Sequence, residues 1–575
     1  MGGVASHPPP NPFTWSHQLA MTRYTGRELR NLLHNRGLLI VVVLIFAFLL
    51  LFVVFPLVKV LQNGIFYNGT FVPEYFLQFF SGQKDIIRPF FNSLLVASLV
   101  AAASTLLGFV FAYATTRTEI PGKRFFRLIA TIPIVSPPFI MALAAILLLG
   151  RNGLITAFAA KHLGFSWNIY GLPGLIITET LAFFPMAFLL LEGVLGGIAP
   201  SLEESALDLG ASKIRTFFRV TLPLATPGIA ASLLFIFSRS LEDFGDPIII
   251  QGRFPVLTTQ IYLAITGMYN IPLGATLAII LLVPTVLAFV FQRYWLSRRS
   301  YVTVTGKPSS SALVRTSPRA KWTLFAIVAL FAFIIIVFYA VVVLGSFTKL
   351  WGINSTFTLD NYRYALTVGS RYLIGSLELA GIATVIGGFL GLTTAYVVAT
   401  KRIVARGLLD FLSMINFAVP GIVIGIGYIF AFNTPPIVLT GTAVIIILVF
   451  LSQRTPAVVR DGVAMLQQLD PVIDEAAADL GAGFFRTFTR VILPLTAPAL
   501  VAGMAYMFAA CITSISAVVM VVSAQWYLIT VALLTSIDRG ALSVAAVSGV
   551  LILVSVMAAI VLMDVVISRV LLRRK

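Results

Sequence analysis

Twelve apolar stretches of roughly 20 residues recur along this 575-residue chain, and they limit the folds that are open to it. A helix of that length crosses the hydrocarbon core of a bilayer. Only 11% of the residues are charged, against about 25% in soluble domains, and 59% are hydrophobic, more than a soluble fold could cover. We therefore expect an all-α membrane protein with twelve transmembrane helices, at 37–61, 92–115, 128–149, 170–195, 226–246, 272–295, 323–346, 373–399, 409–431, 438–459, 497–521 and 542–567.

Basic residues are unevenly distributed between alternate loops. If the N-terminus is cytoplasmic, the loops on the inside hold 29 of the 40 Lys and Arg residues. Cytoplasmic loops of membrane proteins carry this excess, so we expect both termini in the cytoplasm. The net charge of +18 then reflects membrane topology, and we expect membrane lipids but no nucleic acid as partners.

The spans divide into two groups of six. The Ser-, Pro- and Arg-containing stretch 298–322 separates them and reads as a cytoplasmic linker. The expected organisation is a cytoplasmic tail at 1–36, a six-helix domain at 37–297, the linker, and a second six-helix domain at 323–575.

The two groups also match each other in sequence. "SLEESALDLGASKIRTFFRVTLPLATPGI" begins at Ser201, and "VIDEAAADLGAGFFRTFTRVILPLTAPAL" begins at Val472, 271 positions later. A duplicated unit of six spans returns to its starting side, so both halves share one orientation about an axis along the membrane normal. Two such bundles meet at a central interface, where a substrate path can form.

Each repeated loop is expected to form a short helix, a turn and a second short helix. Gly210 and Gly481 can take the positive φ that ends a helix. An amphipathic pattern with several Phe residues follows, and Pro223 and Pro494 are expected to mark the turn into the next span. An apolar helix pair of this kind suits docking into a groove of another protein.

This loop resembles the EAA motif of binding-protein-dependent ABC import permeases, in which Glu-Ala-Ala is followed by a Gly and later by Ile-x-Leu-Pro. The forms here are "ESALDLG…VTLP" and "EAAADLG…VILP", with Ser205 for Ala and with Val220 and Val491 for Ile. The spacing is intact in both copies. The resemblance assigns twelve residues to loops that couple the chain to an ATPase, namely Glu203, Glu204, Ala206, Gly210, Arg219, Pro223, Glu475, Ala476, Ala477, Gly481, Arg490 and Pro494.

The resemblance implies a transport subunit, not an enzyme, made of two parallel-related, fused six-helix permease domains. Its implied partners are two copies of a cytoplasmic ABC ATPase, which bind ATP and Mg, and a periplasmic substrate-binding protein; its location is the bacterial inner membrane. The sequence has no G-x-x-x-x-G-K-[ST] phosphate-binding loop of its own. We expect no catalytic residue and no cofactor on this chain.

Polar residues within the spans mark a candidate substrate path, because they are costly in a bilayer. The end of the fifth span carries charged residues, whereas the equivalent positions of the second half, 271 residues later, include hydroxyls. An alternative is that Arg239 only pairs with Glu242 while the other charges sit in interfacial water. The expected path residues are Arg239, Glu242, Asp243, Asp246, Asn416, Thr513, Ser514 and Ser516.

The substrate itself is less constrained. Four scattered His residues and the single Cys511 have no metal-ligand spacing, so we expect no resident metal site. The string "SLEDFGDP…VLTTQIY" and the fused layout resemble ferric-iron-type permeases. Phosphonates, sugar phosphates, thiamine and polyamines remain alternative substrates. A secondary transporter driven by an ion gradient would explain the six-plus-six repeat, but not the paired loops.

Overall fold

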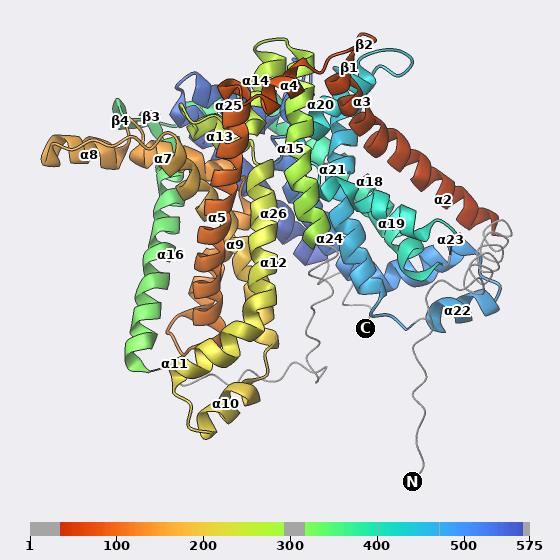
Figure 1. The fold of residues 1–575 in the computed structure, drawn as a ribbon, viewed down its shortest axis with the longest axis horizontal. Coiled ribbons are helices and arrows are strands. Elements are labelled where there is room, and N and C mark those ends of the chain that lie inside the picture. The colour runs from red at the N-terminus through yellow and green to blue at the C-terminus, as the bar shows by residue number, and fades with distance from the viewer. Residues whose placement is uncertain (1–34, 293–316, 402, 471, 567–575) are drawn as a thin grey trace.

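The computed structural model describes residues 35–292, 317–401, 403–470 and 472–566, and these residues are almost entirely helical (Figure 1). The first half contains α2 (Arg36–Leu49), the π-helical segment η1 (Leu50–Val54), α3 (Phe55–Ile65), β1 (Phe66–Tyr67), β2 (Thr70–Phe71), α4 (Glu74–Phe80), α5 (Lys84–Arg117), α6 (Lys123–Val135), α7 (Phe139–Leu149), α8 (Leu154–Leu163), α9 (Leu172–Gly197), α10 (Pro200–Asp208), α11 (Lys213–Thr216), η2 (Phe217–Thr221), α12 (Leu222–Glu242), α13 (Gly245–Ile250), α14 (Leu257–Thr266) and α15 (Ile271–Phe291).

The second half repeats this order closely. It contains α16 (Pro318–Ser346), β3 (Thr348–Leu350), β4 (Asn354–Phe357), α17 (Asp360–Thr367), α18 (Ser370–Thr400), α19 (Arg406–Met414), η5 (Ile415–Phe417), α20 (Gly421–Phe432), α21 (Ala443–Leu466), α22 (Val472–Asp479), α23 (Phe484–Thr487), η6 (Phe488–Ile492), α24 (Leu493–Ile512), η7 (Val518–Met520), α25 (Ile529–Asp538) and α26 (Leu542–Val566). In each half a two-stranded antiparallel hairpin follows the first span.

The expected all-α membrane fold is confirmed. Within the described residues, eleven helices are long and apolar enough to span a bilayer, and a twelfth span is formed if the bent pair α19–α20 counts as one. Residues 1–34 of the tail predicted at 1–36 and most of the linker lie outside the described residues. Arg36, predicted as tail, begins α2, and residues 318–322, predicted as linker, belong to α16.

The third span of each half is not the single helix predicted at 128–149 and 409–431. In the first half α6 ends before 136–138, where two consecutive prolines follow a serine, and α7 begins afterwards. In the second half the chain bends by 109° between Arg406–Phe417 and Gly421–Phe432, around Pro420. Proline lacks the amide hydrogen that a continuous helix needs and restricts the residue before it, so the helices break here.

The expected turn at Pro223 and Pro494 is also wrong. The helix runs without interruption from Lys213 to Glu242, and its counterpart runs from Phe484 to Ile512, so the second short helix of each loop continues into the fifth span. Each proline lies in the first turn after a π-helical segment, where one backbone hydrogen bond is already displaced and the ring can be accommodated.

The first span of each half packs against the other half (Figure 1). The side chains of α2 form a buried apolar cluster with α18, α19 and α23, and the Tyr428 hydroxyl donates a 2.7 Å hydrogen bond to the Phe52 carbonyl. Conversely, α16 packs on α5, α6 and α7, and the Trp351 indole N–H donates to the Leu147 carbonyl at 3.0 Å. Each first span therefore packs on the half to which it does not belong in sequence, and we call this arrangement the exchange of first spans. It joins the two halves over much of their length.

Candidate functional site

The two repeated loops lie at one end of the molecule, opposite the end that carries α14 and α25 (Figure 1). Gly210 and Gly481 have φ values of +84° and +75°, as the sequence predicted. In each loop the backbone N–H three residues beyond the helix end donates to a carbonyl in the last turn of the helix: Ala211 donates to Ala206 and Ala482 to Ala477, both at 3.0 Å. This pairing satisfies the helix end and fixes the angle between the two short helices.

The loops expose apolar side chains at matching positions. Leu209 and Leu480, each directly before the turn glycine, are 89% and 88% exposed. Of the twelve predicted coupling residues, the exposed ones are Glu204, Gly210, Arg219, Pro223, Glu475, Ala476, Gly481, Arg490 and Pro494; Ala206 is half-buried, and Glu203 and Ala477 are buried. The exposed residues are divided between the two loops.

Glu203 differs from its neighbour Glu204 because it points inward. It is 2% exposed, and its carboxylate pairs with Arg117 at 3.4 Å and accepts a 2.6 Å hydrogen bond from the Thr221 hydroxyl. At the equivalent position of the second half, Asp474 pairs with Lys401 at 2.6 Å and accepts a hydrogen bond from the Tyr396 hydroxyl. Each loop is therefore attached to the C-terminal end of the second span of its own half, which the sequence alone did not indicate.

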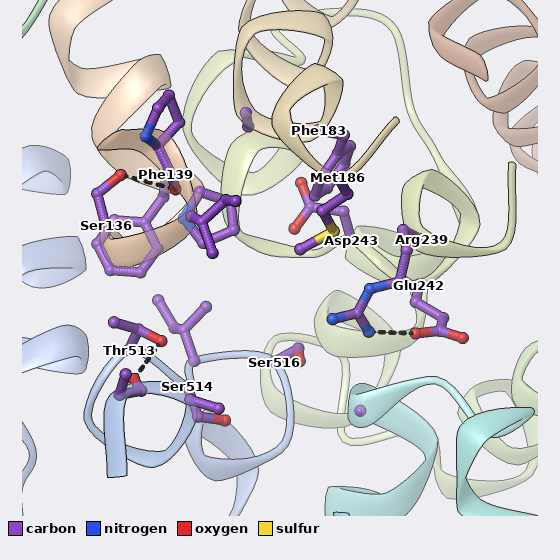
Figure 2. Close-up of a pocket in the computed structure, with 18 of the residues that line it drawn as sticks. Ser136, Phe139, Phe183, Met186, Arg239, Glu242, Asp243, Thr513, Ser514 and Ser516 are labelled. Carbon is purple, nitrogen blue, oxygen red and sulfur yellow. Dashed lines mark hydrogen bonds and ion pairs between the residues drawn. The ribbon is translucent and has the colours of Figure 1, made fainter. Parts of the chain in front are cut away.

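A cavity of about 140 Å³ lies between the two halves (Figure 2). Several of its residues occupy equivalent positions of the repeat: Ala182 and Phe183 correspond to Gln453 and Arg454. It is bordered by the break between α6 and α7, by α9 and α12, and, from the second half, by the start of α20, by α21, by α24 and by the segment after α24. Six of the predicted path residues line it, namely Arg239, Glu242, Asp243, Thr513, Ser514 and Ser516.

The charges around the cavity are balanced. Arg239 pairs with Glu242 at 3.2 Å, as the alternative interpretation expected, but this pair faces the cavity (Figure 2). Asp243 accepts hydrogen bonds from the backbone N–H groups of Gly245 and Asp246, both at 3.2 Å. Thr513, Ser514 and Ser516 provide hydroxyls from the second half.

Sequence reasoning missed Arg454 and Gln453. Arg454 lies inside the span predicted at 438–459 but was not among the predicted path residues. The structure places it in α21 beside the cavity, and its buried Nε has no hydrogen-bond partner among the described residues. Gln453 accepts a hydrogen bond from the Ser514 hydroxyl at 3.3 Å. The available signal was a charged residue beside Pro456 in an otherwise apolar span.

Two predicted path residues lie elsewhere. Asp246 is fully buried in α13, away from the residues that line the cavity. Asn416 donates a 2.7 Å hydrogen bond to the Ser452 carbonyl and borders a separate, smaller pocket between the first span and the second half. Neither side chain borders the cavity between the halves.

A duplicated helical membrane protein with a polar cavity between its halves and two matched loops at one end is built as a transport permease. The chain belongs to the family described as binding-protein-dependent transport system inner membrane components, whose sequence pattern matches it twice, at residues 104–301 and 383–573. It is thus a fused, two-domain permease and a transport protein of the membrane. Both matches leave out the exchanged first span of the half.

Named relatives agree with this assignment. The chain is 36% identical to the ferric transport system permease protein FbpB of Actinobacillus pleuropneumoniae, over 92% of this chain and 77% of the relative. It is 36% identical to a putative ferric transport system permease of Haemophilus influenzae, over 85% and 78%. The molybdenum transport system permease protein ModB of Escherichia coli is 31% identical over 36% of this chain and 92% of the relative. That relative therefore has about the size of one half of this chain.

Proposed function

We propose that this chain is the permease of an ATP-driven bacterial importer that takes ferric iron from a periplasmic binding protein and releases it into the cytoplasm. Two copies of a cytoplasmic ATPase bind the exposed faces of the coupling loops and hold ATP and Mg. Both chain termini are cytoplasmic. Iron is the cargo of the path and not a resident cofactor of the chain.

The observation that carries the proposal is the oxygen-rich cavity between the halves. Ferric iron is a hard cation that prefers carboxylate, hydroxyl and water oxygens. The cavity offers the carboxylates of Glu242 and Asp243 on one side and the hydroxyls of Thr513, Ser514 and Ser516 on the other. The names of the two relatives that are 36% identical to the chain support the same substrate.

The cavity is suited to passage rather than to storage. Among the described residues, no group of three or more His, Cys, Asp or Glu side chains is placed to hold a metal ion. The guanidinium groups of Arg239 and Arg454 offset the two carboxylates, so a cation is not trapped by a large negative field.

A second substrate class is favoured by the same two arginines. Guanidinium groups bind phosphate and carboxylate oxygens in pairs, so a phosphonate or a sugar phosphate would also find partners in the cavity. The test must therefore compare a ferric ion with an anionic solute.

The test is uptake into proteoliposomes that contain the permease and its ATPase, with the binding protein and with labelled ferric ion or a labelled sugar phosphate. We expect ferric uptake that needs both ATP and the binding protein. Uptake of the sugar phosphate alone would replace iron by the anionic class. Uptake driven by an ion gradient without ATP would contradict the importer class itself.

The cavity is tested by Glu242→Gln, which keeps the shape of the side chain and leaves Arg239 without its charged partner. We expect ferric uptake to fall by about tenfold, a free-energy change of roughly 1.4 kcal/mol. The matched control is Glu192→Gln, which removes the same charge from a 2.8 Å pair with Arg127 outside the cavity. Equal uptake by both variants would show that the cavity carboxylate is not part of the path.

A further inference from the structure

One guanidinium group in the first half joins several elements at the cytoplasmic end. Arg117, the last residue of α5, is 3% exposed. Its Nη2 donates to the carbonyls of Leu195 in α9 and of Ile198, the latter at 2.6 Å, and its Nη1 pairs with Glu203 of α10 at 3.4 Å. Arg117 therefore connects the second span, the end of the fourth span and the first helix of the coupling loop.

The connection continues from Glu203 into the fifth span. The other carboxylate oxygen of Glu203 accepts the 2.6 Å hydrogen bond from Thr221, and Thr221 lies in the continuous helix that ends at Glu242. The two spans reached in this way, α9 and α12, both line the cavity, through Phe183 and Glu242 among others. A displacement of α10 is thus passed by direct contacts to the two long helices that carry the first half's cavity wall.

The second half is connected differently. Asp474 of α22 pairs with Lys401 and accepts from Tyr396, and both belong to the second span α18 or directly follow it. At the position equivalent to Thr221 stands Ile492, which has no hydroxyl. In the part of the chain that the structure describes, the hydrogen bonds and ion pairs of Asp474 reach α18 and Lys401 but neither α21 nor α24, the helices that line the cavity.

The burial of the two networks differs in the same direction. The side chains of Arg117 and Glu203 are 3% and 2% exposed, whereas those of Lys401 and Asp474 are both 21% exposed. A buried network of hydrogen bonds and an ion pair favours one geometry, because breaking it leaves a charge unpaired away from water. The Lys401–Asp474 pair is half-buried and in contact with water, so breaking it costs less than breaking the buried pair.

We propose that Arg117, Glu203 and Thr221 are positioning residues that transmit the movement of the first coupling loop to the cavity, and that the second loop lacks an equivalent connection. This inference rests on the proposed function, because it assumes that an ATPase moves the loops. The two loops are then unequal in their effect: α10 drives the cavity wall, and α22 mainly anchors its ATPase subunit to the second span.

The test measures the number of substrate molecules imported per ATP hydrolysed by the reconstituted full complex, together with the amount of ATPase that co-purifies. Thr221→Val removes only the hydroxyl that joins Glu203 to the fifth span. The matched control is Thr216→Val, five residues earlier in the same loop, whose hydroxyl is also buried but has no hydrogen-bond partner among the described residues. We expect Thr221→Val to lower the import per ATP by about tenfold, within the range of energetic coupling between sites, with normal co-purification. Thr216→Val should behave as the wild type.

A second pair of variants compares the two halves. Glu203→Gln and Asp474→Asn each neutralise the acid of one network while keeping its shape. We expect Glu203→Gln to uncouple hydrolysis from import, and Asp474→Asn to change the import per ATP by less than about threefold, because a half-buried pair in contact with water contributes less than a buried one. A Glu203→Gln variant that accumulates poorly would leave the Thr221→Val comparison as the decisive measurement.

The outcomes separate this inference from the proposed function. A wild-type chain that neither retains the ATPase nor imports with ATP overturns both. A wild-type chain that imports normally, with Thr221→Val equal to Thr216→Val or with equal defects in Glu203→Gln and Asp474→Asn, overturns the inference alone. A loss of co-purification in Thr221→Val would also overturn it, because the residue would then support assembly rather than transmission.

Discussion

Two glycines hold the coupling loops in a backbone conformation that other residues avoid. Gly210 and Gly481 both have positive φ, and a Cβ added at either position would meet no atom within 4 Å. The requirement for glycine is therefore conformational and not steric. The turn is formed by residues only a few positions apart in the chain. The sequence could therefore predict it correctly.

Proline at either glycine tests this requirement. Proline fixes φ near −65°, so Gly210→Pro or Gly481→Pro cannot keep the observed turn and should abolish coupled uptake at normal protein level. Alanine strains the same turn by about 1 kcal/mol and should give a partial loss. ATP-dependent uptake in proteoliposomes measures both effects. Gly196→Ala, in a helix with ordinary φ and open space, is the control and should transport normally; wild-type uptake by the proline variants would contradict the prediction.

Several helical elements of this protein change their geometry at the repeated loops and beside the cavity. Both coupling loops enter the fifth span through a π-helical segment, in which Leu222 N–H bonds to the Phe217 carbonyl and Leu493 N–H to the Phe488 carbonyl. Both third spans are broken at proline, and the breaks border the cavity. The sequence showed where the prolines are. A helix can accommodate a proline either by breaking or by a π-helical insertion, and only the surrounding packing decided which of the two occurs at each proline.

The break in the third span of the second half brings Gly421 against the cavity wall. A Cβ at this position would collide with the Ser516 hydroxyl and lie 2.7 Å from the Gln453 amide nitrogen. Gly421→Ala should therefore push both side chains into the cavity and lower the initial rate of ferric uptake severalfold, since overpacking of this kind costs about 1–3 kcal/mol. Gly407→Ala in α19, where no atom lies within 4 Å, is the control. Unchanged uptake by Gly421→Ala would mean that the cavity does not limit passage.

At the scale of the whole molecule, the exchange of first spans makes the two halves mutually dependent. The helix α3 lies so close to α20 that a Cβ on Gly427 would be 2.9 Å from the Pro56 carbonyl oxygen. The neighbouring Tyr428 binds the Phe52 carbonyl. This contact couples residues more than 370 positions apart and holds the first span of one half on the other.

Widening this contact should destabilise the whole protein. Gly427→Ala forces α3 away from α20 and should lower the free energy of unfolding by about 1–3 kcal/mol. The midpoint of thermal unfolding in detergent should fall accordingly. Gly381→Ala in α18, which has no atom within 4 Å, should leave the midpoint unchanged or raise it slightly, because alanine is the better helix former by about 1 kcal/mol. Equal midpoints for the two variants would contradict the close packing of the exchanged span.

The sequence by itself determined the membrane class, the duplication, the positions of most spans and the glycine turns of the coupling loops. These features follow from composition, from periodicity and from interactions between near neighbours in the chain. Only the tertiary structure decided which polar residues meet. It placed Arg454 in the cavity, left Asp246 outside it, and buried Glu203 while exposing Glu204. It also placed the first span of each half against the other half. The physical reason is that burial and pairing depend on neighbours far away in sequence, which local pattern and hydropathy do not specify.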